Sequence, residues 1–219
     1  MTCGKFPTGS EVRLTLIRHA ESEANVSGRA GGQGPSPLTP LGVEQALRLR
    51  PRTRLLAHDR LIATDLERVR RTVELAFGPD AQVELDPRWR ERDFGAWEGR
   101  TWDEIRGLHP QILETWGAEA FEFRPEGGES WADVGRRAIA ALGDIMSSES
   151  VVVVAHGGPI RLATCHLLGI DPVTSMWSFE LRNTAICTFQ VAKDRTRLVG
   201  WNDVLHLDAS VSFDGRVPV

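Results

Sequence analysis

Two short apolar runs, far apart in the chain, each end at a histidine. Leu14–Ile17 is followed by Arg18 and His19, and Val151–Ala155 is followed by His156 and a pair of glycines. Apolar runs of this length, closed by polar residues or glycine, are typical of buried parallel strands. Ligands of open α/β sheets bind outside the carboxyl ends of such strands, so we expect both histidines at the same edge of one sheet.

Further strand and helix patterns alternate along the chain. Additional strands are expected at Arg60–Thr64, Gln82–Leu85, Ala185–Val191 and Leu198–Trp201. Helices are expected from Pro40, with Thr39 as N-cap, to about Leu49, from a cap at Thr64 or Asp65 to about Phe77, after the capping boxes that open at Thr101 and Ser130, and from Pro159 to about Leu168. This alternation predicts an α/β, three-layer sandwich with a mainly parallel sheet flanked by helices.

Composition narrows the class of protein. The chain has 219 residues, 41% of them hydrophobic and 26% charged, which suits one domain over residues 1–219 with a flexible start at 1–11. No apolar run approaches the roughly 20 residues of a membrane span, and residues 1–10 do not resemble a signal peptide, so we expect a cytoplasmic protein without membrane contact. The net charge of −4 argues against nucleic-acid binding.

The three cysteines lack metal-type spacing, and no histidine and carboxylate cluster has it either, so we expect reduced thiols, no metal and no cofactor.

Two segments are expected to lie around the strand ends. Gly28–Pro37 is rich in glycine and proline and should form a loop after the first strand. Arg88–Ser130 holds four of the seven tryptophans and shows little strand pattern. We expect this segment to form a partial lid, while the alternative, that its tryptophans fill a subsidiary core, remains open.

The histidines and nearby arginines suggest phosphoryl transfer. A single buried histidine is more often a hydrogen-bonded core residue than a catalyst. His19 could instead attack phosphorus with a neutral ring nitrogen, while Arg18 neutralises the oxygens of the phosphoryl group. Such a reaction needs further positive charge, which Arg68 and His156 would supply. The segment from His156 through Gly157 to Pro159 leads into a helix whose free amides favour an anion. A surface arginine and a strand-end cap are the alternative interpretations of Arg68 and His156.

Taken together, six ordered sequence blocks resemble the histidine phosphatase superfamily, in its phosphoglycerate-mutase-like branch. The blocks are Leu16–Ser22 with Asn25, Pro37–Gly42, Thr64–Arg68, Glu91–Gly99, Gly127–Ser130 and Ala155–Arg161. The resemblance implies a phosphoglycerate-mutase-like fold and a covalent phosphohistidine. By position it implies that His19 is the nucleophile, Arg18 and Arg68 bind phosphate, His156 is the second histidine of the phosphate pocket, Asn25 lines that pocket, and Glu91 donates the proton.

General chemistry also favours a carboxyl group such as Glu91. An alkoxide leaving group needs a proton, and the same group can later take a proton from water. Glu21 and Glu98 are competing carboxylates, which we expect to hold local structure around the nucleophile loop and in a turn.

The sequence leaves the reaction and substrate partly open. We expect a phosphomonoester hydrolase acting on a small phosphorylated metabolite, such as a sugar phosphate or a phosphoglycerate-type acid. The alternatives are a phosphoglycerate-type mutase and a silent phospholigand-binding or protein-binding module. Relatives that are mutases usually carry asparagine at the position of Gly158, and many relatives carry aspartate at that of Ser36. The sequence is compatible with either a monomer or a homodimer. Candidates for the outer substrate pocket are Arg29, Gln33, Phe94, Trp97 and Arg124.

Overall fold

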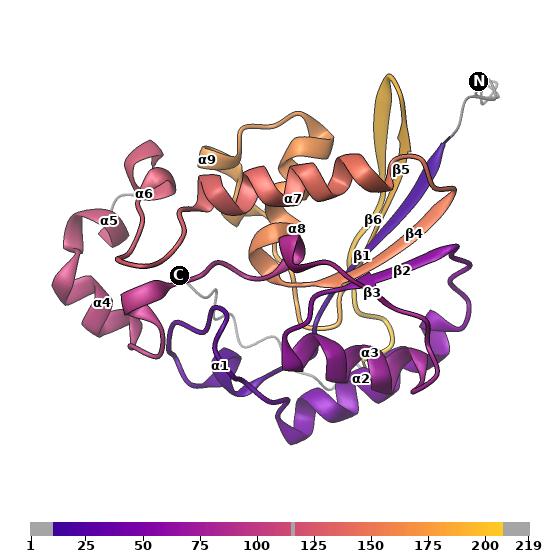
Figure 1. The fold of residues 1–219 in the computed structure, drawn as a ribbon, viewed down its shortest axis with the longest axis horizontal. Helices are drawn as coiled ribbons and strands as arrows, with labels where there is room; N and C mark the ends of the chain where they lie inside the picture. Colours follow the sequence, from indigo (N-terminus) through magenta and orange to yellow (C-terminus); the bar gives the residue numbers. More distant parts are fainter. Residues whose placement is uncertain (1–10, 115–116, 208–219) are drawn as a thin grey trace.

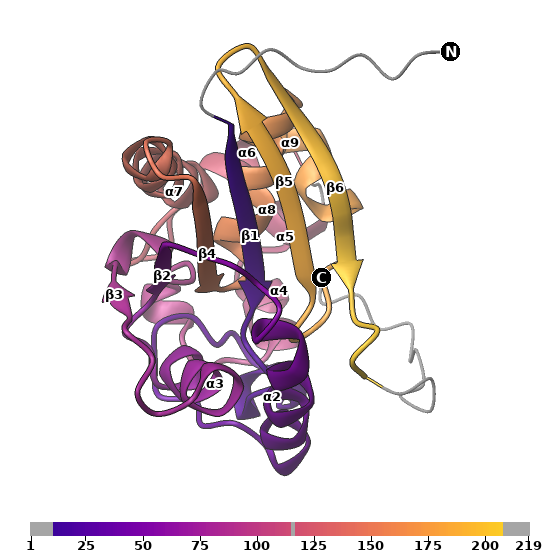
Figure 2. The same cartoon turned by 90° about the vertical axis from the view of Figure 1, so that its right-hand side faces the viewer.

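A six-stranded mixed sheet forms the centre of the computed structural model, which describes residues 11–114 and 117–207. Figure 2 shows the strands side by side in the order β3-β2-β4-β1-β5-β6. Their bounds are β1 Val12–Arg18, β2 Arg60–Ala63, β3 Glu84–Leu85, β4 Ser150–Ala155, β5 Ile186–Ala192 and β6 Arg195–Asp203. β1 to β4 pair in parallel, whereas β5 and β6 are antiparallel additions at one side. The predicted α/β class with a mainly parallel sheet is confirmed.

Helices cover both faces of this sheet (Figure 1). α2 (Pro40–Thr53) and α3 (Glu67–Phe77) lie on one face, and α7 (Trp131–Ile145) and α8 (Gly157–Leu168) lie on the other. The remaining helices are short: α1 Glu23–Val26, α4 Trp102–Leu108, α5 Pro110–Glu114, α6 Ala118–Glu122 and α9 Pro172–Ser175, with 3-10 turns at Pro87–Trp89, Gly95–Trp97 and Met176–Ser178. Within the described ranges, no helix has the length and apolar character that a membrane crossing requires.

The alternation of side chains along β4 explains the two-sided core. Val151 and Val153 pack in the same cluster as α7 and α8, whereas Val152 and Val154 pack with α2 and α3. Successive residues of a strand point to opposite faces, so an unbroken valine run is what a sheet buried on both sides requires. The apolar run ending at His156 therefore places that histidine at the edge of a fully covered sheet.

Local capping is partly as predicted. Thr39 accepts a hydrogen bond from the amide of Gly42 at 3.0 Å, and the boxes at Thr101 and Ser130 are both formed. α2 runs on past the expected end at Leu49 to Thr53, whose Oγ1 donates to the Ala76 carbonyl of α3 at 2.6 Å.

Two predicted helix starts are wrong. α3 begins after Leu66, not after a cap at Thr64 or Asp65. The Thr64 hydroxyl is instead bonded to His156, and the Asp65 carboxylate is paired with Arg90, so tertiary contacts have replaced the local cap that the sequence offered. α8 begins at Gly157, two residues before Pro159.

Part of the segment between residues 88 and 130 has a small core of its own. Phe94, Trp97, Ile105 and Ile112 form a buried cluster, separate from the sheet's clusters, around α4 and α5 (Figure 1). Trp89, by contrast, belongs to the core of the main sheet. This arrangement favours the subsidiary-core interpretation of Trp97. The lid stays a prediction, and Trp116 and residues 1–10 lie outside the described residues.

Candidate active site

The two predicted histidines meet at the carboxyl ends of neighbouring parallel strands. Arg18 at the end of β1 is in register with Ala155 at the end of β4, and the His19 amide donates to the Ala155 carbonyl at 3.0 Å. The imidazole rings of His19 and His156 are consequently 5.0 Å apart between centroids. Both side chains are buried, with 3% and 0% exposure. The topology has brought two chain-distant residues into one site.

His19 is held as a neutral imidazole with one ring nitrogen available. Its Nδ1 lies 2.7 Å from the Ala20 carbonyl oxygen. A carbonyl can only accept, so Nδ1 carries the hydrogen and Nε2 keeps its lone pair. Burial, and then the positive charges of Arg68 and Arg18, lower the pKa of His19 well below its usual value. The ring is therefore unprotonated at neutral pH, as a nucleophile must be.

His156 is fixed by Thr64, one of the two predicted helix caps. Its Nε2 is 3.0 Å from Thr64 Oγ1 at the end of β2. Burial, followed by the charge of Arg68, lowers its pKa well below the usual value. Its Nδ1 is buried and has no hydrogen-bond partner among the residues that the structure describes. A buried polar atom of this kind costs free energy unless something pairs with it, which makes it suited to an incoming oxygen.

Two buried guanidinium groups stand beside the histidines. Arg18 Nη1 donates to the Leu181 carbonyl at 2.6 Å, while its buried Nε has no partner in the described part of the chain. Burial, then the charge of Arg161, lowers the pKa of Arg18 to about 10. Arg68, only 2% exposed, donates through Nη2 to the Gly32 carbonyl at 2.5 Å. Carbonyl oxygens position these cations without cancelling their charge, so the site favours an anion.

Glu91 lies beside the amino end of α8. Its Oε2 accepts a hydrogen bond from the Gly158 amide at 3.2 Å, and its Oε1 accepts one from the Arg92 amide at 2.9 Å. The approach is close, since a Cβ placed on residue 158 would lie 2.3 Å from Glu91 Oε1 and 2.6 Å from the Trp131 ring. Any larger residue at 158 would have to displace the carboxylate or the indole.

The competing carboxylates hold loops, as expected. Glu21 Oε1 accepts from the Thr39 hydroxyl at 2.7 Å, at the start of α2. Glu98 Oε1 accepts from the amides of Gly32 and Gly34 at 2.9 and 3.0 Å. Both side chains are thus occupied with backbone or capping groups, and Glu91 is the carboxylate associated with the helix that follows His156.

Three further predicted residues lie close to the cluster. Gln33 Nε2 donates to the Glu91 carbonyl at 3.1 Å and so supports the backbone at Glu91. Asn25 Oδ1 accepts from Asn183 Nδ2 at 3.2 Å, and the same Asn183 amide donates to the His19 carbonyl at 3.0 Å. A Cβ on Gly157 would lie 3.8 Å from Arg18 Nε, so the backbone of Gly157 is close to the unpaired edge of that guanidinium.

The other outer-pocket candidates have different surroundings. Phe94 and Trp97 are buried in the small core. The Phe94 ring makes an edge-to-face contact with Trp131 and would lie 2.9 Å from a Cβ placed on Gly32. Arg29 donates to the Gly99 carbonyl. Exposed Arg124 pairs with Asp133 at 2.5 Å. The recorded contacts of these four residues do not join them to the two histidines. Ser36 is buried and accepts from the Ala24 amide at 2.9 Å.

One charged residue near the cluster was given no role by the sequence analysis. Arg161 lies in α8, four residues after Gly157, and is 8% exposed. Its Nη1 is 2.8 Å from a Cβ placed on Gly157. Residues four apart lie on the same face of a helix. The spacing between Gly157 and Arg161 is therefore the sequence feature that indicates a position for Arg161 near the histidines.

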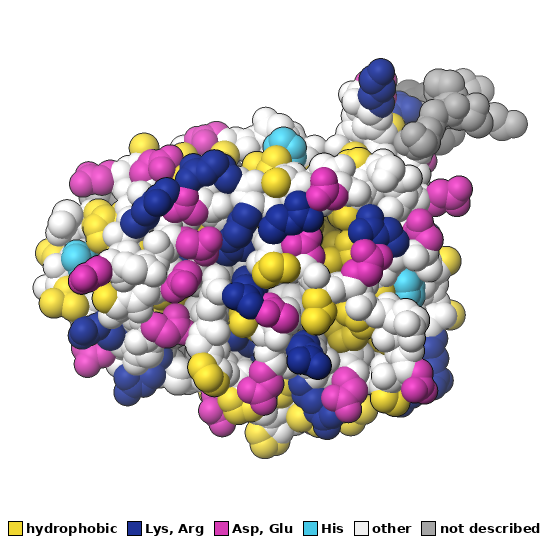
Figure 3. All heavy atoms as spheres, in the orientation of Figure 1, with side chains coloured by type: hydrophobic (Ala, Val, Ile, Leu, Met, Phe, Trp, Pro, Cys, Tyr) yellow, Lys and Arg dark blue, Asp and Glu magenta, His cyan; other side chains and the backbone are white. Residues whose placement is uncertain are grey.

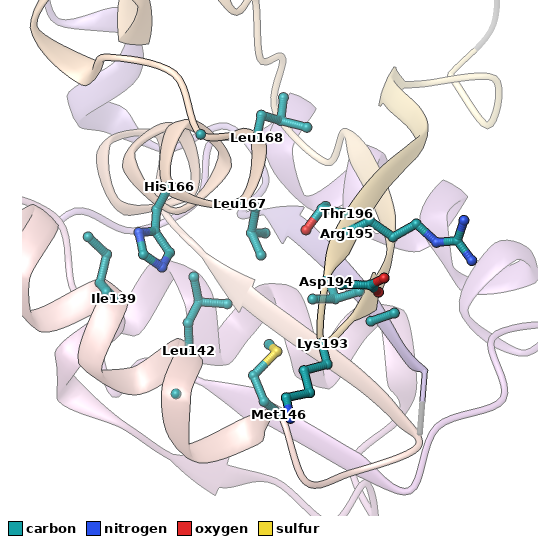
Figure 4. A pocket seen from close by; sticks show the side chains of 14 residues that line it. Ile139, Leu142, Met146, His166, Leu167, Leu168, Lys193, Asp194, Arg195 and Thr196 are labelled. Atoms are coloured by element: carbon teal, nitrogen blue, oxygen red, sulfur yellow. The ribbon is translucent and has the colours of Figure 1, made fainter. Parts of the chain in front are cut away.

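Away from the two histidines, the structure shows a cavity and a surface of mixed charge. A cavity of about 600 Å³ lies between α7, α8 and the turn that joins β5 to β6 (Figure 4). Because Val191 in this turn region pairs with Val12 at the start of β1, the cavity is at the opposite end of the sheet from His19. On the face shown in Figure 3, basic and acidic side chains are interspersed. Across residues 11–114 and 117–207, no group of three or more metal-ligating side chains is placed to hold an ion.

Comparison with known proteins gives the family context. Residues 14–204 match the family described as histidine phosphatase superfamily (branch 1). Phosphoserine phosphatase 1 of Hydrogenobacter thermophilus is 32% identical, covering 90% of this chain and 94% of that protein. A protein named probable phosphoglycerate mutase GpmB, from Cronobacter sakazakii, is 32% identical and covers 90% and 96%. The solved alpha-ribazole phosphatase of Shigella flexneri has a TM-score of 0.77 at 29% identity and covers 88% and 96%.

Proposed function

This chain belongs to the histidine phosphatase superfamily, and we propose that it hydrolyses small phosphomonoesters through a phosphohistidine on His19, without a metal ion. The observation that carries the proposal is the bond between His19 Nδ1 and the Ala20 carbonyl, which leaves Nε2 as the free nucleophilic atom. Arg18, Arg68 and His156 supply the donors for the phosphoryl oxygens. The proposed substrate is a phosphorylated metabolite of the cytoplasm, such as a sugar phosphate or a phosphoglycerate-type acid.

The first half-reaction transfers the phosphoryl group to the enzyme. The Nε2 lone pair of His19 attacks phosphorus, and the bond between phosphorus and the ester oxygen breaks. Glu91 gives its proton to that oxygen, so the alcohol leaves uncharged. The two guanidinium groups stabilise the charge on the non-bridging oxygens, which is the main requirement of phosphoryl transfer.

The second half-reaction restores the enzyme. The Glu91 carboxylate, now deprotonated, takes a proton from water as the water oxygen attacks phosphorus. The bond between phosphorus and Nε2 breaks, its electrons return to His19, and inorganic phosphate leaves. One carboxyl group thus acts as acid and then as base.

Hydrolysis is favoured over the mutase alternative by the surroundings of Gly158. Mutases of the family usually carry asparagine at this position, and here a side chain on residue 158 would have to displace Glu91 or Trp131. Because one relative is named a probable phosphoglycerate mutase, the experiment must also be able to detect mutase activity.

The decisive experiment measures phosphate release from sugar phosphates, phosphoglycerates, nucleotides and p-nitrophenyl phosphate, with EDTA present. The His19→Ala protein is the control. Release by the wild type alone supports the proposal and ranks the substrates. If the folded wild-type protein releases no phosphate from any compound, the hydrolase proposal fails, and isomer interconversion becomes the assay that tests the mutase.

A further inference from the structure

Arg161 is a buried cation that the proposed reaction does not use. Its Nε donates to the Phe179 carbonyl at 2.9 Å, and its guanidinium lies 5.2 Å from the centre of the Trp177 ring. Among the described residues, that carbonyl is the one hydrogen-bond acceptor found for this side chain. Nη1 and Nη2 therefore remain available on a guanidinium whose orientation is fixed by an aromatic ring and a carbonyl.

Arg161 lies on the Glu91 side of the cluster rather than at His19. A Cβ on Gly157 would be 2.8 Å from Arg161 Nη1, and a Cβ on the next residue, Gly158, would be 2.3 Å from Glu91 Oε1. The charges that act on His19 are those of Arg68 and Arg18, whereas Arg161 interacts with Arg18 and Glu91. This cation is thus close to both Arg18 and Glu91, between the groups proposed for the phosphoryl oxygens and for the leaving group.

The surroundings of Arg161 leave a positive charge in excess. Burial lowers its pKa, and Glu91 is the carboxylate that opposes this effect most. Glu91 must lose its negative charge when it holds the proton for the leaving group, so it cannot serve as a permanent partner. The other carboxylate that acts on Arg161, Glu180, is exposed, so water screens its charge. An anion arriving with the substrate would offset the cost of burying the Arg161 charge.

We propose that Arg161 binds a carboxylate on the leaving group, so that preferred substrates are phosphomonoesters whose alcohol carries a carboxylate close to the ester oxygen. This inference rests on the proposed hydrolysis. The phosphoryl group lies at His19 and Arg18, the ester oxygen at Glu91, and the carboxylate at the free edge of Arg161. Nη1 and Nη2 form the planar pair of donors that a carboxylate accepts with both oxygens.

An alcohol lacking the carboxylate loses the ion pair with Arg161. Arg161 therefore acts on specificity through the part of the substrate that leaves.

The test compares 3-phosphoglycerate with glycerol 3-phosphate, which has a hydroxymethyl group where the first has a carboxylate. We expect the wild type to prefer 3-phosphoglycerate at least tenfold in kcat/KM. Arg161→Gln should lower kcat/KM for 3-phosphoglycerate by about 10- to 100-fold and that for glycerol 3-phosphate by less than about threefold. Arg161→Lys, which keeps the charge, should recover part of the preference. Arg106→Gln, which removes an exposed arginine paired with Asp103 on α4, should leave both values unchanged.

Several outcomes would overturn the inference without touching the proposed function. One is a wild-type enzyme that forms phosphohistidine and hydrolyses both compounds within threefold of each other, a result that stands even if Arg161→Gln does not fold. Another is equal loss on both substrates in a folded Arg161→Gln protein. A wild-type protein that forms no phosphohistidine with any substrate removes the proposed function, and this inference with it.

Discussion

The two ends of the central sheet differ in a way that locates the chemistry. At the carboxyl ends of β1 and β4, His19 and His156 are buried beside Arg18 and Arg68. At the opposite end, the cavity of about 600 Å³ is lined by apolar residues of α7 and α8 and by polar residues of the turn between β5 and β6, with His166 on its wall (Figure 4). The groups with perturbed pKa values are therefore at the opposite end of the sheet from this cavity.

The two ends of the sheet differ in how far their charged and ionisable groups are removed from water. Burial lowers the pKa values of both histidines and of Arg18 at the first end. The charged residues of the cavity, Lys193, Asp194 and Arg195, are exposed and hydrated. Water screens an exposed charge, whereas a buried charge interacts strongly with a bound anion. Substitutions at the two ends should accordingly have very different effects.

The largest difference is expected between two histidines. His19→Ala should reduce turnover by at least about 10⁴-fold, because it removes the nucleophile itself. His166→Ala, at the exposed wall of the cavity, should change turnover less than about twofold. Steady-state phosphate release measures both, and circular dichroism checks that both variants fold. Comparable losses in the two variants would contradict the assignment of the site to the carboxyl end.

Next in size is the effect of removing a phosphate-binding cation. Arg68→Gln should lower kcat/KM by about 10²- to 10³-fold, since it removes buried positive charge beside the phosphoryl group. The matched variant at the other end is Lys193→Gln, which should leave kcat/KM within about twofold. If Arg68→Gln lowers Tm but not kcat/KM, Arg68 only holds the loop at Gly32.

A smaller and more selective effect is expected for the proton donor. Glu91→Gln should slow the hydrolysis of an alkyl phosphate by about 10²-fold, and that of p-nitrophenyl phosphate by less than about tenfold, because p-nitrophenolate leaves without a proton. Hydrolysis rates of the two phosphate esters, measured for the wild type and for Glu91→Gln, test this role of Glu91. Equal losses on both would assign the acid role to another group.

The smallest effect concerns stability and pH. The pKa values of His19 and His156 are lowered on folding, so the unfolded chain binds protons below about pH 6.5 that the folded chain does not. The free energy of unfolding should be at its full value above pH 6.5 and fall by about 1.4 kcal/mol per pH unit for each histidine below it. His206, whose pKa burial lowers to about 4, adds to this trend. Urea unfolding at pH 7.5, 6.5 and 5.5 measures the slope, which His19→Asn should reduce. An unchanged slope would mean that His19 is not desolvated.

The sequence indicated those parts of the fold that depend on local pattern. The valine run before His156 and the capping boxes at Thr101 and Ser130 are local, and each has the structure expected. The cap of α3 failed because Thr64 and Asp65 bond to residues far along the chain.

The same limit applies to the site. The positions of His19 and His156 follow from two strand ends, which the sequence shows directly. Arg161 could not be assigned in the same way, because its surroundings depend on the Phe179 carbonyl and the Trp177 ring brought in from a later segment. The outer-pocket candidates were chosen as loop residues, but burial of Phe94 and Trp97 in a small separate core is a tertiary outcome.

The loop from Gly28 to Pro37 has a consequence for how the family can vary. Adjacent residues of this loop connect the two halves of the site, since the Gly32 carbonyl accepts from Arg68 and the Gln33 side chain donates to the Glu91 carbonyl. The loop thus sets the spacing between the phosphoryl group and the acid that serves the leaving group. Insertions or deletions here would change which alcohols fit while leaving the nucleophile untouched, so substrate range can evolve separately from the transfer chemistry.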